Sequence, residues 1–329
     1  MRSAPGISPA RIKALHGVEP VQGALTHNRW WVYQRERFPL AAHAPLVAAF
    51  SFCAVVYSAA LRGEPGLPAP GTFFVAFVGA LLFFLQLRIA DEFKDHEEDC
   101  RYRPYRPVPR GLIRLRELAV LGVASAVAQL LLALWLHPPL VLVLLLVWGY
   151  LALMSHEFFV RDWLKARPVT YLWSHMLIMP LIDLYATACD WLSAGEGMGA
   201  LPDGLIWFLL ASFCNGVVIE LGRKIRASAD EETGVETYSA LWGPGRALVL
   251  WLGAIGATAF FASLAAARID ILAPVLLLLL GVFAVAAFAA FRFMRAMSPG
   301  AGKRFEWISG VWTLVMYLGL GGGSLIWTM

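Results

Sequence analysis

Nine long apolar stretches restrict the fold of this 329-residue chain more than any other feature. A helix needs about 20 consecutive, mostly apolar residues to cross the hydrocarbon core of a bilayer. Stretches close to that length occupy residues 40–61, 71–90, 118–136, 140–159, 170–190, 204–221, 247–267, 271–291 and 307–327. Since 59% of the residues are hydrophobic and only 15% are charged, the composition excludes a water-soluble domain. The sequence therefore predicts an all-α, polytopic membrane protein with nine transmembrane helices.

The basic residues predict how this protein lies in the bilayer. With nine spans, the N-terminus and the even-numbered loops share one side, and they carry every Lys and Arg except Arg62 and Arg268. Because basic loops are retained in the cytoplasm, we predict a cytoplasmic N-terminus and a C-terminus outside. The net charge of +4 follows from this topology, so the expected partner is the lipid bilayer and not a nucleic acid.

The domain organisation is predicted to be simple. Residues 1–39 are polar and lack an early apolar run, so they predict a cytoplasmic N-terminal segment and no cleavable signal peptide. The end of this segment is predicted to form a short amphipathic helix on the membrane surface, with Trp30, Trp31 and Tyr33 as interface anchors. Residues 40–329 are predicted to form a single transmembrane domain of nine helices.

A dense acidic row follows the second apolar stretch. Residues 91–99 read DEFKDHEED, which puts six carboxylates into nine residues. Acid at the end of a membrane span is costly unless cations offset it. On a continuous helix Glu92, Asp95 and Asp99 would lie on one face, and such oxygen ligands suit Mg²⁺, which leaves its other positions to water and substrate phosphates. The row predicts a magnesium site, with a solvated helix end as the alternative.

A basic loop comes next along the chain. Residues 101–111 read RYRPYRPVPRG, in which four arginines alternate with prolines, so an extended loop is expected. Guanidinium groups match phosphate oxygens in a bidentate manner. Positive-inside topology would explain these arginines but not the adjoining carboxylates. The acidic row and the basic loop together predict a clamp for a diphosphate.

A second segment of mixed charge spans residues 220–239, after the sixth apolar stretch. Glu220 lies at the end of that stretch, where a carboxylate is a candidate catalytic residue. It could also simply pair with Arg223 or Lys224, three and four residues further on. The sequence leaves both interpretations open.

Ionisable residues in other spans give one more catalytic candidate. Asp183 lies within the fifth stretch, with His175 on a roughly similar helical face. Because charge inside a bilayer is costly, Asp183 is interpreted either as a group that binds the acceptor and removes its proton or as an internal hydrogen-bond partner. His156 and Glu157 end the fourth stretch without the second histidine of a zinc helix, so they are interpreted as interface residues.

These motifs resemble those of the UbiA superfamily of intramembrane prenyltransferases. Residues 91–99 resemble the family's N-D-x-x-D-x-x-x-D motif, with Asp91 in place of the Asn, and residues 103–111 resemble its R-P-x-x-x-G stretch. Residues 230–237 are similar to the D-x-x-x-G-x-x-T end of its second acidic motif. The nine spans and the two charged loops occur in the family's order, so the resemblance covers nearly the whole chain.

The resemblance implies a helical bundle around a central cavity, in which Mg²⁺ holds a polyprenyl diphosphate while its prenyl group is transferred to an acceptor that the sequence does not identify. The implied metal ligands are Asp91, Glu92, Asp95, Asp99 and Asp230. The implied diphosphate ligands are Arg103 and Arg106, with Lys165 and Arg167 standing where the family has a basic pair. The site would face the cytoplasm.

The second motif departs from the family pattern at two positions. The family has acids four and seven residues before Asp230, where this chain has Arg226 and Arg223. Two metal ligands are thereby replaced by cations, so a complete second magnesium site is not expected. We predict that Arg223 and Arg226 contact phosphate directly, in place of one metal ion.

Other functions share parts of this pattern. Some relatives transfer phosphoribose to a polyprenyl phosphate, and others cyclise terpenes. A CDP-alcohol phosphotransferase also has aspartates on membrane helices, but its Asp-Gly and Ala-Arg pairs are absent from residues 91–99. The alternative outside enzymes is a transporter or scaffold that binds a phospholipid or isoprenoid without turnover. Release of diphosphate from a labelled donor separates an enzyme from a binder.

Overall fold

The structure, a computed structural model, describes residues 28–327 apart from 65, 196–200 and 233–234. In these ranges the chain is helical and contains no strand. Its elements, in chain order, are α2 (Arg29–Arg37), α3 (Leu40–Leu61), α4 (Pro70–Lys94), α5 (His96–Tyr102), α6 (Leu115–Leu136), α7 (Leu140–Ser155), η1 (Glu157–Phe159), α8 (Arg161–Lys165), α9 (Pro168–Met176), α10 (Ile178–Trp191), α11 (Leu205–Arg223), η2 (Ser228–Asp230), α12 (Tyr238–Trp242), α13 (Pro244–Ala267), α14 (Leu272–Arg295), α15 (Lys303–Tyr317), η3 (Leu318–Gly322) and α16 (Gly323–Trp327).

The long helices coincide with the predicted spans. Within the described residues, eight helical segments are long and apolar enough to cross a membrane, two of them built from consecutive shorter helices. The remaining predicted span is α7, which is equally apolar but only 16 residues long. The predicted all-α membrane fold is therefore confirmed, and the count of nine spans includes this one short helix.

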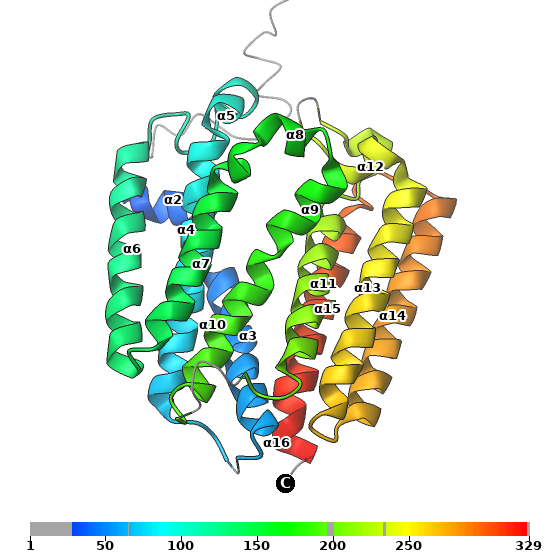
Figure 1. Ribbon diagram of the computed structural model, residues 1–329. Coiled ribbons are helices and arrows are strands. Elements are labelled where there is room, and N and C mark those ends of the chain that lie inside the picture. The colour runs from blue at the N-terminus through cyan, green and yellow to red at the C-terminus, as the bar shows by residue number, and fades with distance from the viewer. Residues whose placement is uncertain (1–27, 65, 196–200, 233–234, 328–329) are drawn as a thin grey trace, which may run out of the picture.

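The long helices run side by side, and the charged loops gather at one end of the bundle (Figure 1). The segments α5, α8 and α12, which belong to three different loops, lie at this end, while the C-terminus lies at the opposite end. We call the end with α5, α8 and α12 the polar end. The alternation of loops matches the arrangement that the basic residues predict.

The fifth span is broken near its middle. Helix α9 ends at Met176 and α10 starts at Ile178, four residues and two residues before Pro180. Proline has no N–H to donate to the carbonyl of the residue four positions earlier, so the helix is interrupted there. His175 and Asp183 consequently belong to different helices, and the prediction that they share a helical face is wrong.

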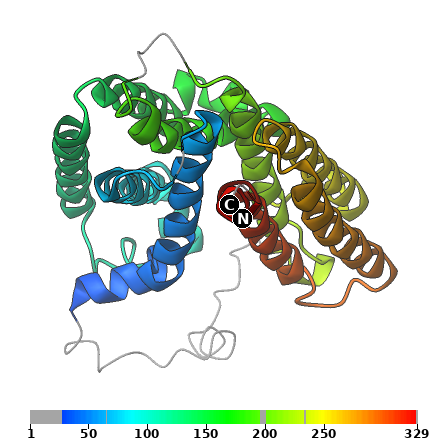
Figure 2. The ribbon, with the colours of Figure 1, turned by 90° about the horizontal axis from the view of Figure 1, so that it is seen from below.

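Helix α2 lies across the long helices rather than along them (Figure 2). The predicted helix before the first span is present, but Tyr33 is only 2% exposed and packs against Ile89 and Ile113. Its predicted role as an interface anchor is therefore wrong, because the ring is part of a small core between α2, α4 and the loop after α5. Trp31, at 56% exposed, remains free to contact lipid head groups.

The last span approaches α3 very closely at a glycine. A Cβ atom on Gly321, in the π-helical segment η3, would lie only 2.4 Å from the Cα of Cys53. No side chain fits there without moving the backbone of α3. The glycine is required for this contact.

We expect Gly321→Val to destabilise the protein by about 1–3 kcal/mol, the usual range for overpacking a core. Gly322→Ala is the matched control, because nothing lies within 4 Å of a Cβ at that position. Thermal unfolding in detergent should give a clearly lower Tm for the first variant alone. Equal Tm values for both variants would contradict the close packing of η3 on α3.

Candidate functional site

The acidic row does not form one helical face. Helix α4 ends at Lys94 and α5 begins at His96, with Asp95 as the joint between them. The chain bends at this residue, so Glu92 and Asp99 point to different partners. The prediction of a continuous acidic face is therefore wrong, although each carboxylate remains at the polar end.

Two carboxylates of the row are buried and paired with arginine. Glu92, 2% exposed, forms an ion pair with Arg37 of α2. Asp99, also 2% exposed, accepts hydrogen bonds from Arg106 and, at 2.9 Å, from Arg103. Burial raises the pKa of the Asp99 carboxyl, but the two guanidinium groups outweigh this effect and hold its pKa below the ordinary value. Both predicted phosphate ligands of the basic loop are thus tied to the acidic row.

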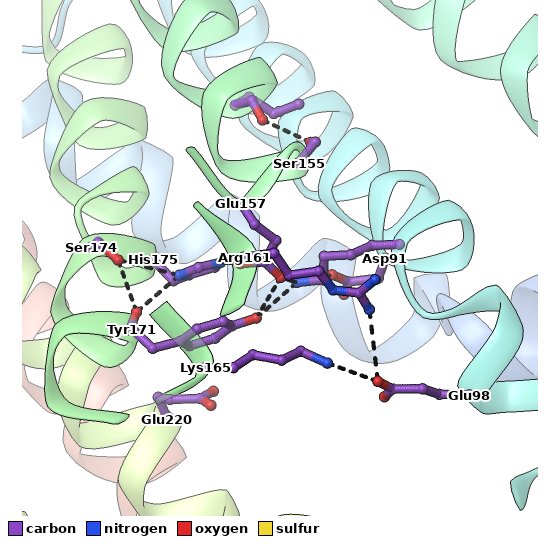
Figure 3. A network of polar contacts seen from close by, with 12 residues as sticks. Asp91, Glu98, Ser155, Glu157, Arg161, Lys165, Tyr171, Ser174, His175 and Glu220 are labelled. Atoms are coloured by element: carbon purple, nitrogen blue, oxygen red, sulfur yellow. Dashed lines mark hydrogen bonds and ion pairs between the residues drawn. The ribbon is translucent and has the colours of Figure 1, made fainter. Parts of the chain in front are cut away.

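The loop between α7 and α9 joins the acidic row through Lys165. Its Nζ donates a hydrogen bond of 2.8 Å to Oε1 of Glu98, and Arg161 lies 3.7 Å from the same oxygen (Figure 3). The hydrogen bond from Lys165 lowers the pKa of the Glu98 carboxyl. Arg167 instead stacks on the ring of Trp163, 4.3 Å from its centroid. The structure therefore brings Lys165 to the predicted clamp and leaves Arg167 beside it.

A buried polar network occupies the centre of the polar end (Figure 3). The hydroxyl of Tyr171 donates a hydrogen bond of 3.1 Å to Oε1 of Glu157, and Lys94 Nζ donates one of 3.1 Å to the Tyr171 hydroxyl oxygen. His175 Nε2 lies 3.4 Å from Glu157 Oε2. Glu157 is only 3% exposed, so its interpretation as an interface residue is wrong.

The charge of Glu157 is held by these neighbours. Burial raises the pKa of its carboxyl, but the contacts with His175, Lys94 and Tyr171 outweigh burial and lower that pKa to about 2. The carboxylate is therefore ionised at neutral pH.

The backbone at Glu157 is strained. Glu157, Phe158 and Phe159 have φ values of 51°, 52° and 61°, so three successive residues other than glycine adopt the left-handed conformation. Each costs about 1 kcal/mol or more relative to the right-handed form. Such strain is found mostly at functional sites, where surrounding contacts maintain it. Here the strained residue Glu157 is the one whose carboxylate accepts the hydrogen bond from Tyr171.

The end of α11 faces this network from the other half of the bundle. Glu220, 8% exposed, forms ion pairs with Arg223 and, at 3.0 Å, with Lys224, so the pairing interpretation of its sequence is confirmed. Arg223 also lies within electrostatic reach of Asp91 on α4. The ends of α4 and α11, far apart in the chain, thus both lie at the polar end, in electrostatic range of each other.

Asp230 and Arg226, the rest of the second motif, contact residues of their own loop and of the loop between α14 and α15. Asp230 Oδ2 accepts a 2.8 Å hydrogen bond from the backbone N–H of Gly300, and Arg226 forms a 3.0 Å ion pair with Glu232. A pocket of about 390 Å³ between these loops is lined in part by Arg223, Arg226 and Asp230. The predicted residues Arg223 and Arg226 therefore line a common space.

Asp183 lies deeper in the bundle than the other candidates. It is fully buried, and the hydroxyl of Tyr317 donates a 2.6 Å hydrogen bond to its Oδ2. Its Oδ1 has no hydrogen-bond partner among the described residues. It lies on α10, beyond the break that separates this helix from α9 and His175. The structure therefore separates Asp183 from the charged groups of the polar end.

These side chains fit one magnesium ion better than two. The Asp91 carboxylate is 43% exposed and contacts Arg88 and Lys94 only at 3.5 and 3.9 Å, and the Asp95 side chain has no ion pair in the described part of the chain. Mg²⁺ commonly takes one or two carboxylates and completes its shell with water and phosphate. Glu92, Asp99 and Asp230 are engaged by other donors, and no group of three His, Cys, Asp or Glu side chains gathers around a common point in the described residues. Of the predicted metal ligands, Asp91 and Asp95 are the two that other groups of the described residues engage least.

Apolar helices with charged loops meeting at one end define an integral, multi-pass membrane protein. The chain belongs to the UbiA prenyltransferase family, whose model matches residues 48–314. Members of this family are prenyltransferases, so membership supports a transferase role. No curated protein matches this chain by sequence.

Two solved structures share the fold. One is the apo structure of a UbiA homologue from Aeropyrum pernix K1, with a TM-score of 0.62, 15% identity, and coverage of 86% of this chain and 98% of that chain. The other is a digeranylgeranylglyceryl phosphate synthase described in membranes, with a TM-score of 0.61, 13% identity, and coverage of 91% and 99%. At these identities the likeness concerns the fold alone.

Sequence reasoning missed Lys94, Tyr171 and His175 as members of the site. A signal for two of them was available, because Tyr171 and His175 are four residues apart and so lie on one face of a short helix. Lys94 was missed because it stands among the carboxylates of the acidic row, where a lysine is expected simply to neutralise its neighbours in the sequence. The inward position of Glu157 had no sequence signal, because no glycine marks the left-handed turn.

We expect Arg37→Gln to lower the free energy of unfolding by about 3–5 kcal/mol, because it leaves the buried Glu92 carboxylate unpaired. Arg29→Gln is the matched control on the same helix: its ion pair with Glu117 is 49% and 27% exposed and should contribute less than about 1 kcal/mol. Denaturant unfolding of the two variants measures the difference. Similar small losses would show that the Arg37 pair is not a stabilising contact.

Acid should weaken the fold through Glu157. The pKa of this carboxyl falls from 4.5 to about 2 on folding, so its contribution to stability is complete above about pH 4.5 and is lost as the pH falls towards 2. Glu157→Gln should therefore show a smaller loss of Tm than the wild-type protein between pH 5 and pH 3. Parallel acid profiles would contradict the lowered pKa of Glu157 in the folded state.

Proposed function

We propose that this chain is a Mg²⁺-dependent prenyltransferase that transfers a prenyl or related group from a polyprenyl diphosphate to an acceptor inside the membrane. The observation that carries the proposal is the arrangement of both charged motifs at the polar end, where Arg223 at the end of α11 and Asp91 near the end of α4 lie close enough to interact electrostatically. Carboxylates for a metal and cations for phosphate are the groups that a diphosphate requires.

The donor diphosphate is proposed to bind at the polar end. Asp91 and Asp95 would hold the Mg²⁺, which when bound offsets negative charge on the leaving group. Arg103 and Arg106 each use part of the guanidinium fork for Asp99, and the remaining N–H groups can donate to phosphate oxygens. The proposed further phosphate ligands are Lys165, Arg167, Arg223 and Arg226.

In the proposed reaction, the bond between the allylic carbon and the diphosphate oxygen breaks, and its electron pair leaves with the diphosphate. The acceptor attacks the allylic carbon and loses a proton. Cations fixed in place before the reaction stabilise the charge that develops on the leaving oxygen. The prenyl chain would lie among the apolar helices, which keep water from the reactive carbon.

The proposed group for the acceptor's proton is Asp183. Its carboxylate is fully buried inside the bundle, with Tyr317 and Ser212 as its polar neighbours. Glu220, the other predicted catalytic carboxylate, has two cationic partners, which supports a role in positioning Arg223 and Lys224.

The proposed topology places the polar end in the cytoplasm, with the N-terminus on that side and the C-terminus outside. The concentration of Lys and Arg in the loops of this end supports it. Residues 40–329 are proposed to act as one domain, in agreement with a family match that spans residues 48–314.

Release of diphosphate tests the proposal. Purified protein with Mg²⁺ and labelled polyprenyl diphosphates should release diphosphate when a suitable acceptor is present. Asp91→Asn and Asp95→Asn should each lower kcat/KM by roughly 100-fold, the scale for removing one group that stabilises developing charge. Glu97→Gln, an exposed carboxylate of the same row, is the matched control and should retain activity.

The same assay separates the alternatives. A terpene cyclase would release diphosphate without any acceptor, and a phosphoribosyltransferase would release it from a phosphoribosyl diphosphate instead. A transporter or scaffold would bind the donor and release nothing. Any of these three results would replace the proposed prenyl transfer to an acceptor.

A further inference from the structure

Lys94 has hydrogen-bonding capacity that the protein does not use. An ammonium group carries three N–H donors. One donates to the Tyr171 hydroxyl oxygen at 3.1 Å, while Glu157 Oε1 lies at 3.5 Å and Asp91 Oδ1 at 3.9 Å. Hydrogen bonds between N–H and oxygen are about 2.7–3.2 Å long. Two of the three donors are therefore without an acceptor at bonding distance in the described part of the chain.

The side chain of Lys94 is also well enclosed. It is 16% exposed, and its ammonium lies 5.7 Å from the centroid of the Tyr171 ring. Donors left unsatisfied in such surroundings are costly, and an anionic ligand removes that cost. The ammonium lies 3.9 Å from Oδ1 of Asp91, which is a proposed magnesium ligand. An anion bound through that metal would lie next to Lys94.

The position of Lys94 is fixed by residues from two other segments. Its ammonium donates to Tyr171, the Tyr171 hydroxyl donates to Glu157, and Glu157 is turned inward by the left-handed segment 157–159. The Tyr171 ring stacks on His175, with centroids 3.9 Å apart and planes within 11°. The left-handed backbone at residues 157–159 and the stacked ring of Tyr171 thus both support the groups that position the Lys94 ammonium.

Lys165 offers a contrast within the same end of the bundle. Its side chain is 43% exposed, and its ammonium makes a hydrogen bond of 2.8 Å to Glu98. This lysine is a partner of an exposed carboxylate, with little to fix it further. Lys94 is more buried, more rigidly held and less satisfied.

We propose that Lys94 binds the diphosphate of the donor, and that Tyr171 and Glu157 position its ammonium for this contact. The inference rests on the proposed function and adds a cation from α4 to the proposed phosphate ligands. When the bond to the allylic carbon breaks, the electron pair moves onto the diphosphate. Lys94 then donates a hydrogen bond to the oxygen that gains charge, and no proton is transferred.

Binding of inorganic pyrophosphate tests the proposal apart from turnover. The full-length protein in nanodiscs is titrated with pyrophosphate in the presence of Mg²⁺, by calorimetry. Lys94→Gln should weaken binding roughly 10- to 100-fold, the range for a hydrogen bond to a charged group. Lys94→Arg should recover most of the affinity, because it keeps the charge. Arg295→Gln, at an exposed arginine at the end of α14, is the control for loss of a surface cation and should bind like the wild type.

Tyr171→Phe tests positioning without changing charge. It removes the hydroxyl that holds the ammonium, so pyrophosphate affinity should fall several-fold and the KM for the donor should rise. A merely structural tyrosine would lower the Tm and leave both values unchanged.

Wild-type affinity in Lys94→Gln would overturn the proposal and leave Lys94 as the structural partner of Glu157. Absence of pyrophosphate binding in the wild type would overturn it as well. A wild-type protein that binds pyrophosphate but releases none from any polyprenyl donor would refute the proposed function, while the comparison of the Lys94 variants would still decide the role of this lysine.

Discussion

Compensation of buried charge is the constraint on which the polar end depends. Carboxylates at the edge of a membrane are costly unless a cation lies against them. Glu92 obtains its cation from α2, and Asp99 obtains its cations from the loop after α5. Glu157 obtains its cation from α4. The Arg37–Glu92 pair adds a charged contact to the small apolar core that already joins α2 and α4, and the arginines on Asp99 hold the loop after α5 against its own helix.

This pairing also explains why the site combines few free carboxylates with many cations. The paired carboxylates position arginine and lysine side chains around a common space. Those that remain less engaged, Asp91 and Asp95, lie where the bend between α4 and α5 opens the row. The two kinds alternate along the row: Glu92 and Asp99 hold arginines of α2 and of the loop after α5, while Asp91 and Asp95 between and beside them are less engaged.

The sequence predicted what depends on local composition and missed what depends on tertiary partners. Apolar length defines a span residue by residue, so the helices were found with nearly correct bounds. The order of the charged motifs was enough to indicate the family. The burial of Tyr33, the bend at Asp95 and the left-handed turn at Glu157 have no local pattern, because each is imposed by a segment that is distant in the chain. Only Pro180 gave a local signal that could have predicted the break of its span.

The ion pair between Arg37 and Glu92 has a consequence for the order of assembly. Its partners are 55 residues apart, and the intervening chain contains α3 and nearly all of α4. Helix α2 is synthesised first. Its Arg37 can pair with Glu92 only after the hairpin of α3 and α4 has entered the bilayer and brought Glu92 back to the side of α2. The pairing of Glu92 therefore depends on correct insertion. A hairpin of α3 and α4 in the wrong orientation would leave Glu92 without its cation, and α2 could not dock against α4.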